Sequence, residues 1–233
     1  MEFSHVSFAY NAEGRKTSLR DIDIVVQPGE NIAVVGSTGA GKSTLMKLLL
    51  RFYDVTEGSV EIDGHAVRDV SLESLREAIR VVSQSPLLFN TTIMENLRYA
   101  RLSATDGEIH EACKAAATQA DTGLSERLQY ERRRKRHEAV RWELQRLAIV
   151  RIFLKDPHIL VLDEATSAVD VLIESAIQSA LRNITESQTT FAIAHRLAIV
   201  VNAGRILVMH EGSVVEHGTH EELLAQNGRY AQM

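Results

Sequence analysis

The sequence predicts an α/β fold whose core is a mainly parallel β-sheet. Residues 32–35 form an uninterrupted apolar run, which is typical of a strand buried on both faces. Runs that are apolar, or apolar after a single threonine, recur at 159–162, 190–193 and 206–209. A glycine-rich loop and a helical pattern follow the first run directly, and strand and helix patterns alternate among the later runs. Between about residues 85 and 150 the pattern is largely helical, which indicates a helical subdomain inserted into the core.

The N-terminal part of the chain predicts a smaller antiparallel β subdomain. Apolar and polar residues alternate over 3–10 and again over 22–26, which indicates two half-buried strands. Pro28-Gly29 marks a turn before the apolar run. A hairpin is predicted where residues 59–62 are followed by Asp63-Gly64, a dipeptide that favours tight turns.

The middle of the chain, from residue 71 to about residue 120, predicts helices interrupted by a short strand at 81–82 and by a loop at Pro86. The helix that begins at Asp106 carries four small or apolar residues on one face, which indicates a buried face. These four residues are Ile109, Ala112, Cys113 and Ala116.

The composition excludes several classes of protein. Of 233 residues, 45% are hydrophobic and 24% are charged, which is typical of a globular domain. No window approaches 18 consecutive apolar residues, so no transmembrane segment is expected, and the first ten residues do not resemble a signal peptide. The single cysteine excludes an internal disulfide. A net charge of -5 gives no general attraction to nucleic acids or anionic lipids.

A phosphate-binding motif follows the apolar run at 32–35. Its sequence, GSTGAGKST, matches G-x-x-x-x-G-K-[ST] between a strand and a helix, which is the context that the motif requires. Glycines let the backbone approach phosphate oxygens, and N–H groups at the helix N-terminus supply positive potential. We expect Lys42 to reach the β- and γ-phosphates and the Ser43 hydroxyl to hold Mg²⁺. The predicted nucleotide-binding residues here are Gly36, Ser37, Thr38, Gly39, Ala40, Gly41, Lys42, Ser43 and Thr44.

Two acidic residues follow the apolar run at 159–162. The carboxyl ends of parallel strands meet at the edge where a phosphate loop lies, so we expect Asp163 to position Mg²⁺ and Glu164 to orient an attacking water. Two solvated acids at a strand end are the alternative interpretation, and the nearby phosphate motif disfavours it.

Further segments resemble the nucleotide-binding domain of an ATP-binding-cassette (ABC) transporter, over nearly the whole chain. Residues 159–170 read ILVLDEATSAVD, similar to the Walker B motif and D-loop of that family. AHRL at 194–197 resembles its switch-histidine motif, and VSQ at 82–84 resembles its Q-loop. VSFAY at 6–10 resembles the segment whose aromatic side chain stacks on adenine, and GTHEEL at 218–223 is also typical. The sequences of these motifs are most similar to those of exporters, particularly mitochondrial and heavy-metal-tolerance half-transporters.

The resemblance implies a P-loop NTPase fold, a single nucleotide-binding domain over 1–233 and a role for each matching residue. Tyr10 would stack on the base, although a tyrosine packed at a strand end is the alternative. Gln84 would contact Mg²⁺ or the water, His195 the γ-phosphate and Asp170 a partner domain. The implied catalytic residues are Glu164, His195 and Gln84, and the implied metal ligands are Ser43, Gln84 and Asp163.

The resemblance also implies ligands, partners and a location. Transporters of this family hydrolyse ATP between two nucleotide-binding domains packed head to tail. We therefore expect ATP and Mg²⁺ as ligands, and a second such domain and a transmembrane domain as partners. No nucleic-acid partner is expected. The chain would lie on the cytosolic or matrix face of a membrane. Because Met1 stands just ahead of the first strand, we expect a piece of a longer protein.

The chain departs from the family at residues 139–143. The resemblance places there the signature L-S-G-G-[QE], whose serine and glycine amides meet the γ-phosphate held by the partner domain. This chain reads AVRWE instead, and the V-G-E-x-G stretch expected just upstream is missing. Valine, arginine and tryptophan side chains prevent the close backbone approach that glycine allows.

Three interpretations stay open for residues 127–142, where seven basic and two acidic residues give a charge of +5 (7 − 2). The basic run at 132–136 is compatible with a nuclear-localisation or nucleic-acid patch, or with a solvated helix face. The third interpretation is a pair of compensating frame errors. Suitable codons for 127–142, read one base later, encode GYNTNVGESGMKLSGG, and the only codon of Trp142 necessarily yields glycine.

These observations predict an ATP-hydrolysing domain that powers export by an ABC transporter. One rival is a non-catalytic module that binds Mg-ATP without dimer closure, because the signature is lost. Another is a soluble cassette protein that acts on nucleic acid, which only the basic run supports. ATP turnover separates the first two, and salt-dependent DNA binding would be needed for the third. The transported substrate is not predicted.

Overall fold

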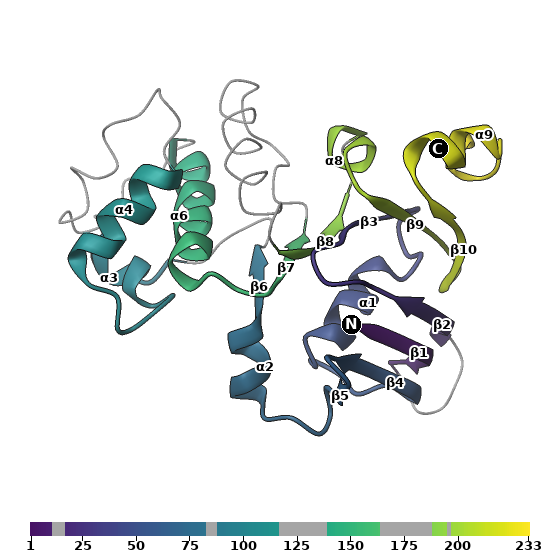
Figure 1. The fold of residues 1–233 in the computed structure, drawn as a ribbon, viewed down its shortest axis with the longest axis horizontal. Coiled ribbons are helices and arrows are strands. Elements are labelled where there is room, and N and C mark those ends of the chain that lie inside the picture. The colour runs from purple at the N-terminus through teal and green to yellow at the C-terminus, as the bar shows by residue number, and fades with distance from the viewer. Residues whose placement is uncertain (11–16, 83–87, 117–138, 164–187, 195–196) are drawn as a thin grey trace. The chain divides into compact units, whose positions relative to one another are not determined.

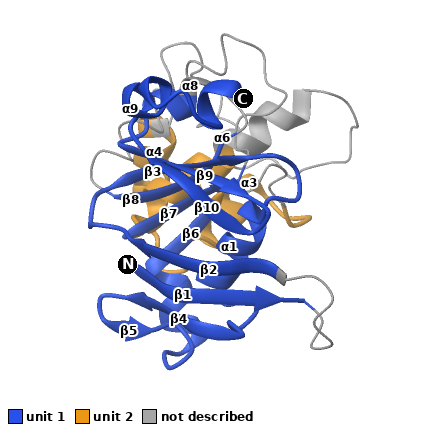
Figure 2. Ribbon diagram, turned by 90° about the vertical axis from the view of Figure 1, so that its right-hand side faces the viewer, with its two compact units in different colours: residues 1–81, 158–163, 188–233 blue, residues 82–157, 164–187 orange. Residues whose placement is uncertain are grey.

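The computed structural model describes residues 1–10, 17–82, 88–116, 139–163, 188–194 and 197–233 (Figure 1). The chain forms two compact units, coloured separately in Figure 2. The first unit comprises Met1–Val81, His158–Asp163 and Gln188–Met233, and the second comprises Val82–Pro157 and Glu164–Ser187. Among the described residues, no helix combines the length and apolar character needed to cross a membrane.

The first unit contains the predicted antiparallel β subdomain. Its four-stranded sheet has the order β2-β1-β4-β5, and all its strand pairs are antiparallel. Asp63 and Gly64 join the last two strands with φ values of 50° and 76°, because the tight turn of such a hairpin needs two left-handed residues. The strands are β1 (Glu2–Ala9), β2 (Thr17–Val25), β4 (Glu57–Ile62) and β5 (His65–Ala66).

The second sheet of this unit is the predicted, mainly parallel core. Its order is β10-β9-β3-β8-β7-β6. Strand β3 is parallel to both β8 and β9, and β7 is parallel to β8, whereas β10 is an antiparallel edge strand on β9. The strands are β3 (Asn31–Gly36), β6 (Ile79–Val82), β7 (Ile159–Asp163), β8 (Thr189–Ile193), β9 (Arg205–His210) and β10 (Ser213–Gly218).

Strand β3 explains why residues 32–35 are all apolar. Ile32 and Val34 belong to the large core cluster, which also contains Phe3 of the antiparallel sheet. Ala33 and Val35 belong to a second cluster on the opposite side of the strand, which also contains Leu223. Successive side chains of a strand point to opposite faces, so a strand buried on both faces carries no polar position.

Short helices complete the first unit. They are α1 (Lys42–Leu49), α2 (Leu72–Ala78), α8 (Leu197–Val201), α9 (His220–Ala225) and a 3₁₀ turn (Tyr230–Gln232). The N-terminus of α9 has a reciprocal cap, in which Thr219 accepts from the Glu222 N–H and Glu222 accepts from the Thr219 N–H. Helix α2 begins after Ser71, whose side chain accepts from the Ser74 N–H.

The described helices of the second unit are α3 (Ile93–Arg98), α4 (Asp106–Ala116) and α6 (Ala139–Lys155), and α6 packs on the other two. The predicted buried face of α4 is confirmed for Ile109, Ala112 and Cys113, which are buried, whereas the Ala116 side chain lies outside the described residues. Burial raises the pKa of the Cys113 thiol to about 11, so this side chain packs as an inert apolar group.

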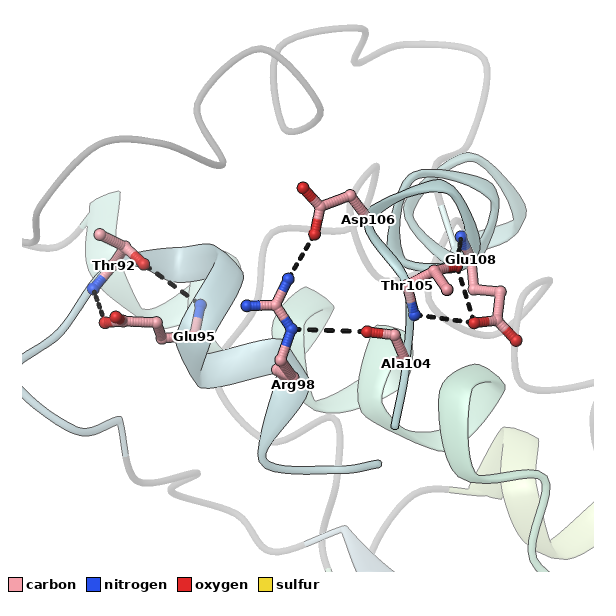
Figure 3. Close-up of polar contacts among 7 residues, drawn as sticks. All are labelled: Thr92, Glu95, Arg98, Ala104, Thr105, Asp106 and Glu108. Atoms are coloured by element: carbon pink, nitrogen blue, oxygen red, sulfur yellow. Dashed lines mark hydrogen bonds and ion pairs between the residues drawn. The ribbon is translucent and has the colours of Figure 1, made fainter. Parts of the chain in front are cut away.

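Polar contacts hold the connection between α3 and α4 (Figure 3). Arg98 at the end of α3 donates to the Ala104 carbonyl and to the Asp106 carboxylate. Thr105 and Glu108 cap the start of α4 reciprocally. The predicted helical subdomain at 85–150 lies within the residue range of this unit, and its bounds and the single-domain assignment stay predictions.

Candidate nucleotide-binding site

The loop between β3 and α1 has the backbone that its glycines predict. Gly36 has φ of 150°, and a Cβ added there would lie 2.4 Å from the Met209 carbonyl oxygen. Gly41, the N-cap of α1, has φ of 108°, and a Cβ there would lie 2.7 Å from Leu19 Cδ2. Any other residue at Gly36 would force β9 away from the loop, whereas at Gly41 it would displace the Leu19 side chain and strain the positive φ.

The base of this loop is anchored and its tip is open. The Ala40 N–H donates to the Ser37 carbonyl (3.1 Å), and the Ala40 carbonyl accepts from the Gly212 N–H (3.1 Å). Ala40 is buried, whereas Ser37, Thr38 and Gly39 are exposed. The loop therefore presents three successive backbone units to an incoming ligand from a rigid base.

Lys42 is folded into the loop. Its side chain is buried, and its Nζ donates to the carbonyls of Gly36 (2.6 Å) and Ser37 (3.1 Å). The ammonium group thus lies against the loop that presents Ser37–Gly39 backbone to solvent, at the N-terminus of α1. Positive charge from the ammonium group and from the helix end coincides there, and this combination binds anions.

Ser43 and Thr44 differ in their surroundings. Ser43 is exposed on the first turn of α1, so its hydroxyl is available to a ligand. Thr44 is buried, and its Oγ1 lies 3.2 Å from the hydroxyl oxygen of Tyr10. The structure therefore links Tyr10, predicted to stack on a base, directly to the helix of the phosphate motif.

Asp163 is the last residue of β7 and is partly exposed. It pairs in register with Ile193 of β8, and Ile193 pairs with Val34 of β3. Because these three neighbouring strands are parallel, Asp163 and the phosphate loop leave the sheet at the same edge. The other predicted residues lie outside the described residues: Gln84, Glu164, Asp170 and His195.

The donors suit a hard cation bound together with phosphate. Ser43 offers a hydroxyl oxygen and Asp163 a carboxylate, which are ligands of the kind that Mg²⁺ takes alongside substrate phosphates. Within the described part of the chain, no cluster of three or more histidine, cysteine, aspartate or glutamate side chains could hold a metal ion. The described oxygen donors could therefore supply only part of a coordination shell.

Sequence reasoning missed the residues that surround Tyr10. The ring of Tyr10 contacts Phe8 (centroids 4.9 Å apart) and Tyr53 (5.1 Å), and Lys47 Nζ lies 5.7 Å from its centroid. Lys47 stands four residues after Ser43 and shares its helix face, a spacing that the sequence does contain. No spacing predicts Tyr53, because it reaches Tyr10 only through the fold.

The segment at 139–143, predicted to hold the signature, begins helix α6, which starts at Ala139. The backbone there is helical, as a signature at a helix N-terminus requires, but the sequence is AVRWE. The side chains of 139–146 and all of 117–138 lie outside the described residues. The three interpretations of 127–142 therefore stay open.

Comparison with known proteins identifies the family. The ABC transporter family matches residues 19–167. The chain is 48% identical over 235 residues to the ABC transporter aclQ of Aspergillus oryzae, covering 100% of this chain and 29% of that protein. It is 49% identical over 231 residues to the heavy metal tolerance protein of Schizosaccharomyces pombe, covering 97% of this chain and 27% of that protein.

Two further comparisons agree. ATP-binding cassette sub-family B member 6 of Rattus norvegicus is 46% identical over 235 residues, covering 100% of this chain and 28% of that protein. A solved bacterial Atm1-family ABC exporter with ATP bound is similar with a TM-score of 0.87 and 38% identity, covering 99% of this chain and 40% of that one.

The chain spans less than a third of the length of these curated relatives, at 27–29%. Family membership implies ATP binding, and members of the family are ATPases. The resemblance to exporters and the predicted P-loop NTPase fold are both confirmed. The chain belongs to the ABC transporter family, as a nucleotide-binding domain of the exporter type.

Proposed function

We propose that this chain is a domain that binds Mg-ATP on its phosphate loop and, once residues 139–143 read as the family signature, hydrolyses it to power export through a transmembrane domain. The observation that carries the proposal is the position of Lys42, whose ammonium group lies against the loop carbonyls of Gly36 and Ser37. The tip of that loop is exposed. A triphosphate would therefore meet backbone N–H groups and a preorganised cation at the same place.

Lys42 exchanges partners when the nucleotide binds. Phosphate oxygens are anionic, so they are stronger acceptors than the carbonyls of Gly36 and Ser37. The ammonium group would move from these carbonyls to the β- and γ-phosphates without leaving the loop. The loop amides and the N-terminus of α1 would hold the remaining phosphate charge.

Ser43, Asp163 and Gln84 would hold Mg²⁺. Their hydroxyl, carboxylate and amide oxygens match the preference of this ion, and support comes from the shared sheet edge of Asp163 and the phosphate loop. When bound, Mg²⁺ would neutralise charge on the phosphates. Glu164 would orient the attacking water and His195 would contact the γ-phosphate, roles that follow from the sequence motifs.

The relatives support the proposed partners. Curated relatives that are about three times longer, one of them named an ABC transporter, support a transmembrane domain and dimerisation. We assign to this chain a head-to-tail pairing with a second nucleotide-binding domain, and a position on the cytosolic or matrix face of a membrane.

A non-catalytic binding module is the second candidate. One observation favours it: residues 139–143 read AVRWE, so the chain as written lacks the glycines that close the partner's site. Under this alternative, Tyr10, Lys42, Ser43 and Asp163 still bind Mg-ATP. The two candidates therefore share the binding site and differ in turnover.

The test of the site is Lys42→Ala, measured by calorimetry with Mg-ATP. Loss of the charged hydrogen bonds to the phosphates should weaken binding by about 100-fold or more. Lys114→Ala is the matched control, because Lys114 is exposed and pairs with Glu111 in the second unit. Equal affinity of the Lys42→Ala chain and the unchanged chain would refute the assignment of the site.

A further inference from the structure

We propose that Tyr53 positions Tyr10 for base binding, and is thus a second aromatic determinant of adenine recognition. The inference rests on the proposed function, because it needs a nucleotide base at Tyr10. Tyr10 and Tyr53 come from segments 43 residues apart in sequence (53 − 10), yet their ring centroids are 5.1 Å apart with an interplanar angle of 89°. Such edge-to-face pairs are attractive beyond the area that they bury.

Four contacts define the orientation of Tyr10. The ring has edge-to-face contacts with Phe8 (4.9 Å, 81°) and Tyr53, and the Lys47 ammonium group lies over it. The hydroxyl at its tip lies 3.2 Å from Thr44 Oγ1. Tyr10 nevertheless stays 44% exposed, so much of its surface is free for a ligand. A flat ring that is fixed in one orientation but remains exposed to solvent is a preorganised surface for stacking.

Among Phe8, Thr44 and Tyr53, Tyr53 can be changed with the least damage to the domain. Phe8 is buried in the core and Thr44 belongs to the phosphate motif, whereas Tyr53 is 44% exposed. The ring of Tyr53 also contacts Phe8, with centroids 5.6 Å apart. Each of the three rings therefore contacts the other two.

The backbone after α1 holds Tyr53 in place. Arg51 has φ of 51°, and the Phe52 N–H donates to the Lys47 carbonyl at 2.8 Å, which is the hydrogen bond of a Schellman turn. The Arg51 side chain donates to the Val70 carbonyl (2.7 Å) and pairs with Asp54 (3.4 Å). The turn that ends the phosphate-motif helix α1 thus brings Tyr53 into contact with Tyr10.

The experiment measures the affinities of Mg-ATP and of inorganic tripolyphosphate for variants of the chain. Tripolyphosphate has no base, so a change at Tyr10 should not affect it. Tyr53→Leu should weaken Mg-ATP binding about 3- to 10-fold and leave tripolyphosphate binding unchanged. Tyr53→Phe should retain the affinity of the unchanged chain, since the ring remains.

The matched control is Phe52→Leu. Phe52 is 61% exposed and, among the described residues, has no ring contact, so its replacement should change neither affinity. A Tyr10→Leu background supplies the decisive comparison: there Tyr53→Leu should have no further effect, because it acts through Tyr10. Tyr53→Met repeats the comparison with another ringless side chain if the leucine variant does not fold.

Each remaining outcome overturns a distinct claim. Unchanged Mg-ATP affinity in Tyr53→Leu, equal losses for both ligands, or full additivity with Tyr10→Leu would each refute the positioning role alone. No preference of the unchanged chain for Mg-ATP over tripolyphosphate, or no effect of Tyr10→Leu, would instead refute the base-binding role of Tyr10. Absence of Mg-ATP binding to the unchanged chain would refute the proposed function and this inference together.

Discussion

The Lys42 ammonium group already donates hydrogen bonds to the carbonyls of Gly36 and Ser37. A nucleotide bound there would therefore gain only the difference in free energy between these hydrogen bonds and the ones that its phosphates form with the ammonium group. In the proposed exchange the buried cation would stay partnered at every stage, whereas a buried charge without partners would be costly. At the scale of single residues, the proposed site would thus use charge that is already held in place rather than charge recruited from solvent.

An exposed ion pair in the first unit gives a test by pH. His5 Nδ1 lies 2.8 Å from Asp21 Oδ1, and both residues have positive φ. The hydrogen bond to Asp21, its charge and the charge of Asp23 raise the pKa of His5 above 6.5. We therefore expect an NMR titration of the His5 ring to show a raised pKa that Asp21→Asn lowers.

The sign of the stability effect follows from the same shift. A raised pKa in the folded state stabilises the fold below pH 6.5, and this contribution disappears as the pH rises through the folded value. Asp23→Asn is the control and should lower the pKa of His5 less than Asp21→Asn does. A His5 titration that is the same in all three chains would contradict the pairing.

At the scale of elements, one amide fixes the start of α3. Asn96 is 1% exposed; its Oδ1 accepts from the Phe89 N–H (2.8 Å), and its Nδ2 donates to the Phe89 and Thr92 carbonyls (3.0 Å each). Arg151 of α6 donates to the Asn96 carbonyl (3.1 Å) and side chain (3.3 Å). A single buried side chain thus ties the preceding loop to two helices of the second unit.

Asn96→Ala should lower the free energy of unfolding by about 2–3 kcal/mol, because it leaves buried polar groups without partners. Urea denaturation measures this change. Glu111→Ala is the control, since the exposed pair that it breaks with Lys114 is worth only about 0–1 kcal/mol. A loss in Asn96→Ala no greater than that of the control would show that the amide network does not hold the loop.

At the scale of the whole molecule, we expect turnover to depend on a second domain and on the sequence of residues 127–142. The chain as written should neither dimerise with ATP nor hydrolyse it efficiently, because removing preorganised donors costs about 10²–10³ in rate per donor. A chain in which 127–142 read GYNTNVGESGMKLSGG should recover both activities. ATPase assays and size-exclusion chromatography with ATP measure the two effects.

Lys42→Ala in the restored chain is the control, and it should again weaken ATP binding by about 100-fold or more. Turnover of the written chain equal to that of the restored one would refute the frame-error hypothesis. Genomic and transcript sequences that give the arginine-rich reading cleanly would refute it as well. In either case, the basic run at 132–136 would need another role.

The sequence by itself determined the elements whose signals are local. The apolar run at 32–35, the glycine-rich motif and the Asp63-Gly64 turn each specify backbone geometry within a few residues, and each was found as predicted. Strand β10 was missed because its turn uses Glu211-Gly212, with φ values of 47° and 86°, and glutamate is not a typical residue for that geometry.

Only the tertiary structure decided which distant segments meet. The strand order brings Asp163 to the edge of the phosphate loop, and the turn after α1 brings Tyr53 to Tyr10. The periodicity of apolar residues shows which face of an element is apolar but not which partner covers it. The hydrophobic effect is non-directional, so any apolar neighbour of suitable shape can cover that face. Asn96 looks like an ordinary polar residue in the sequence, and only packing makes it the link between a loop and two helices.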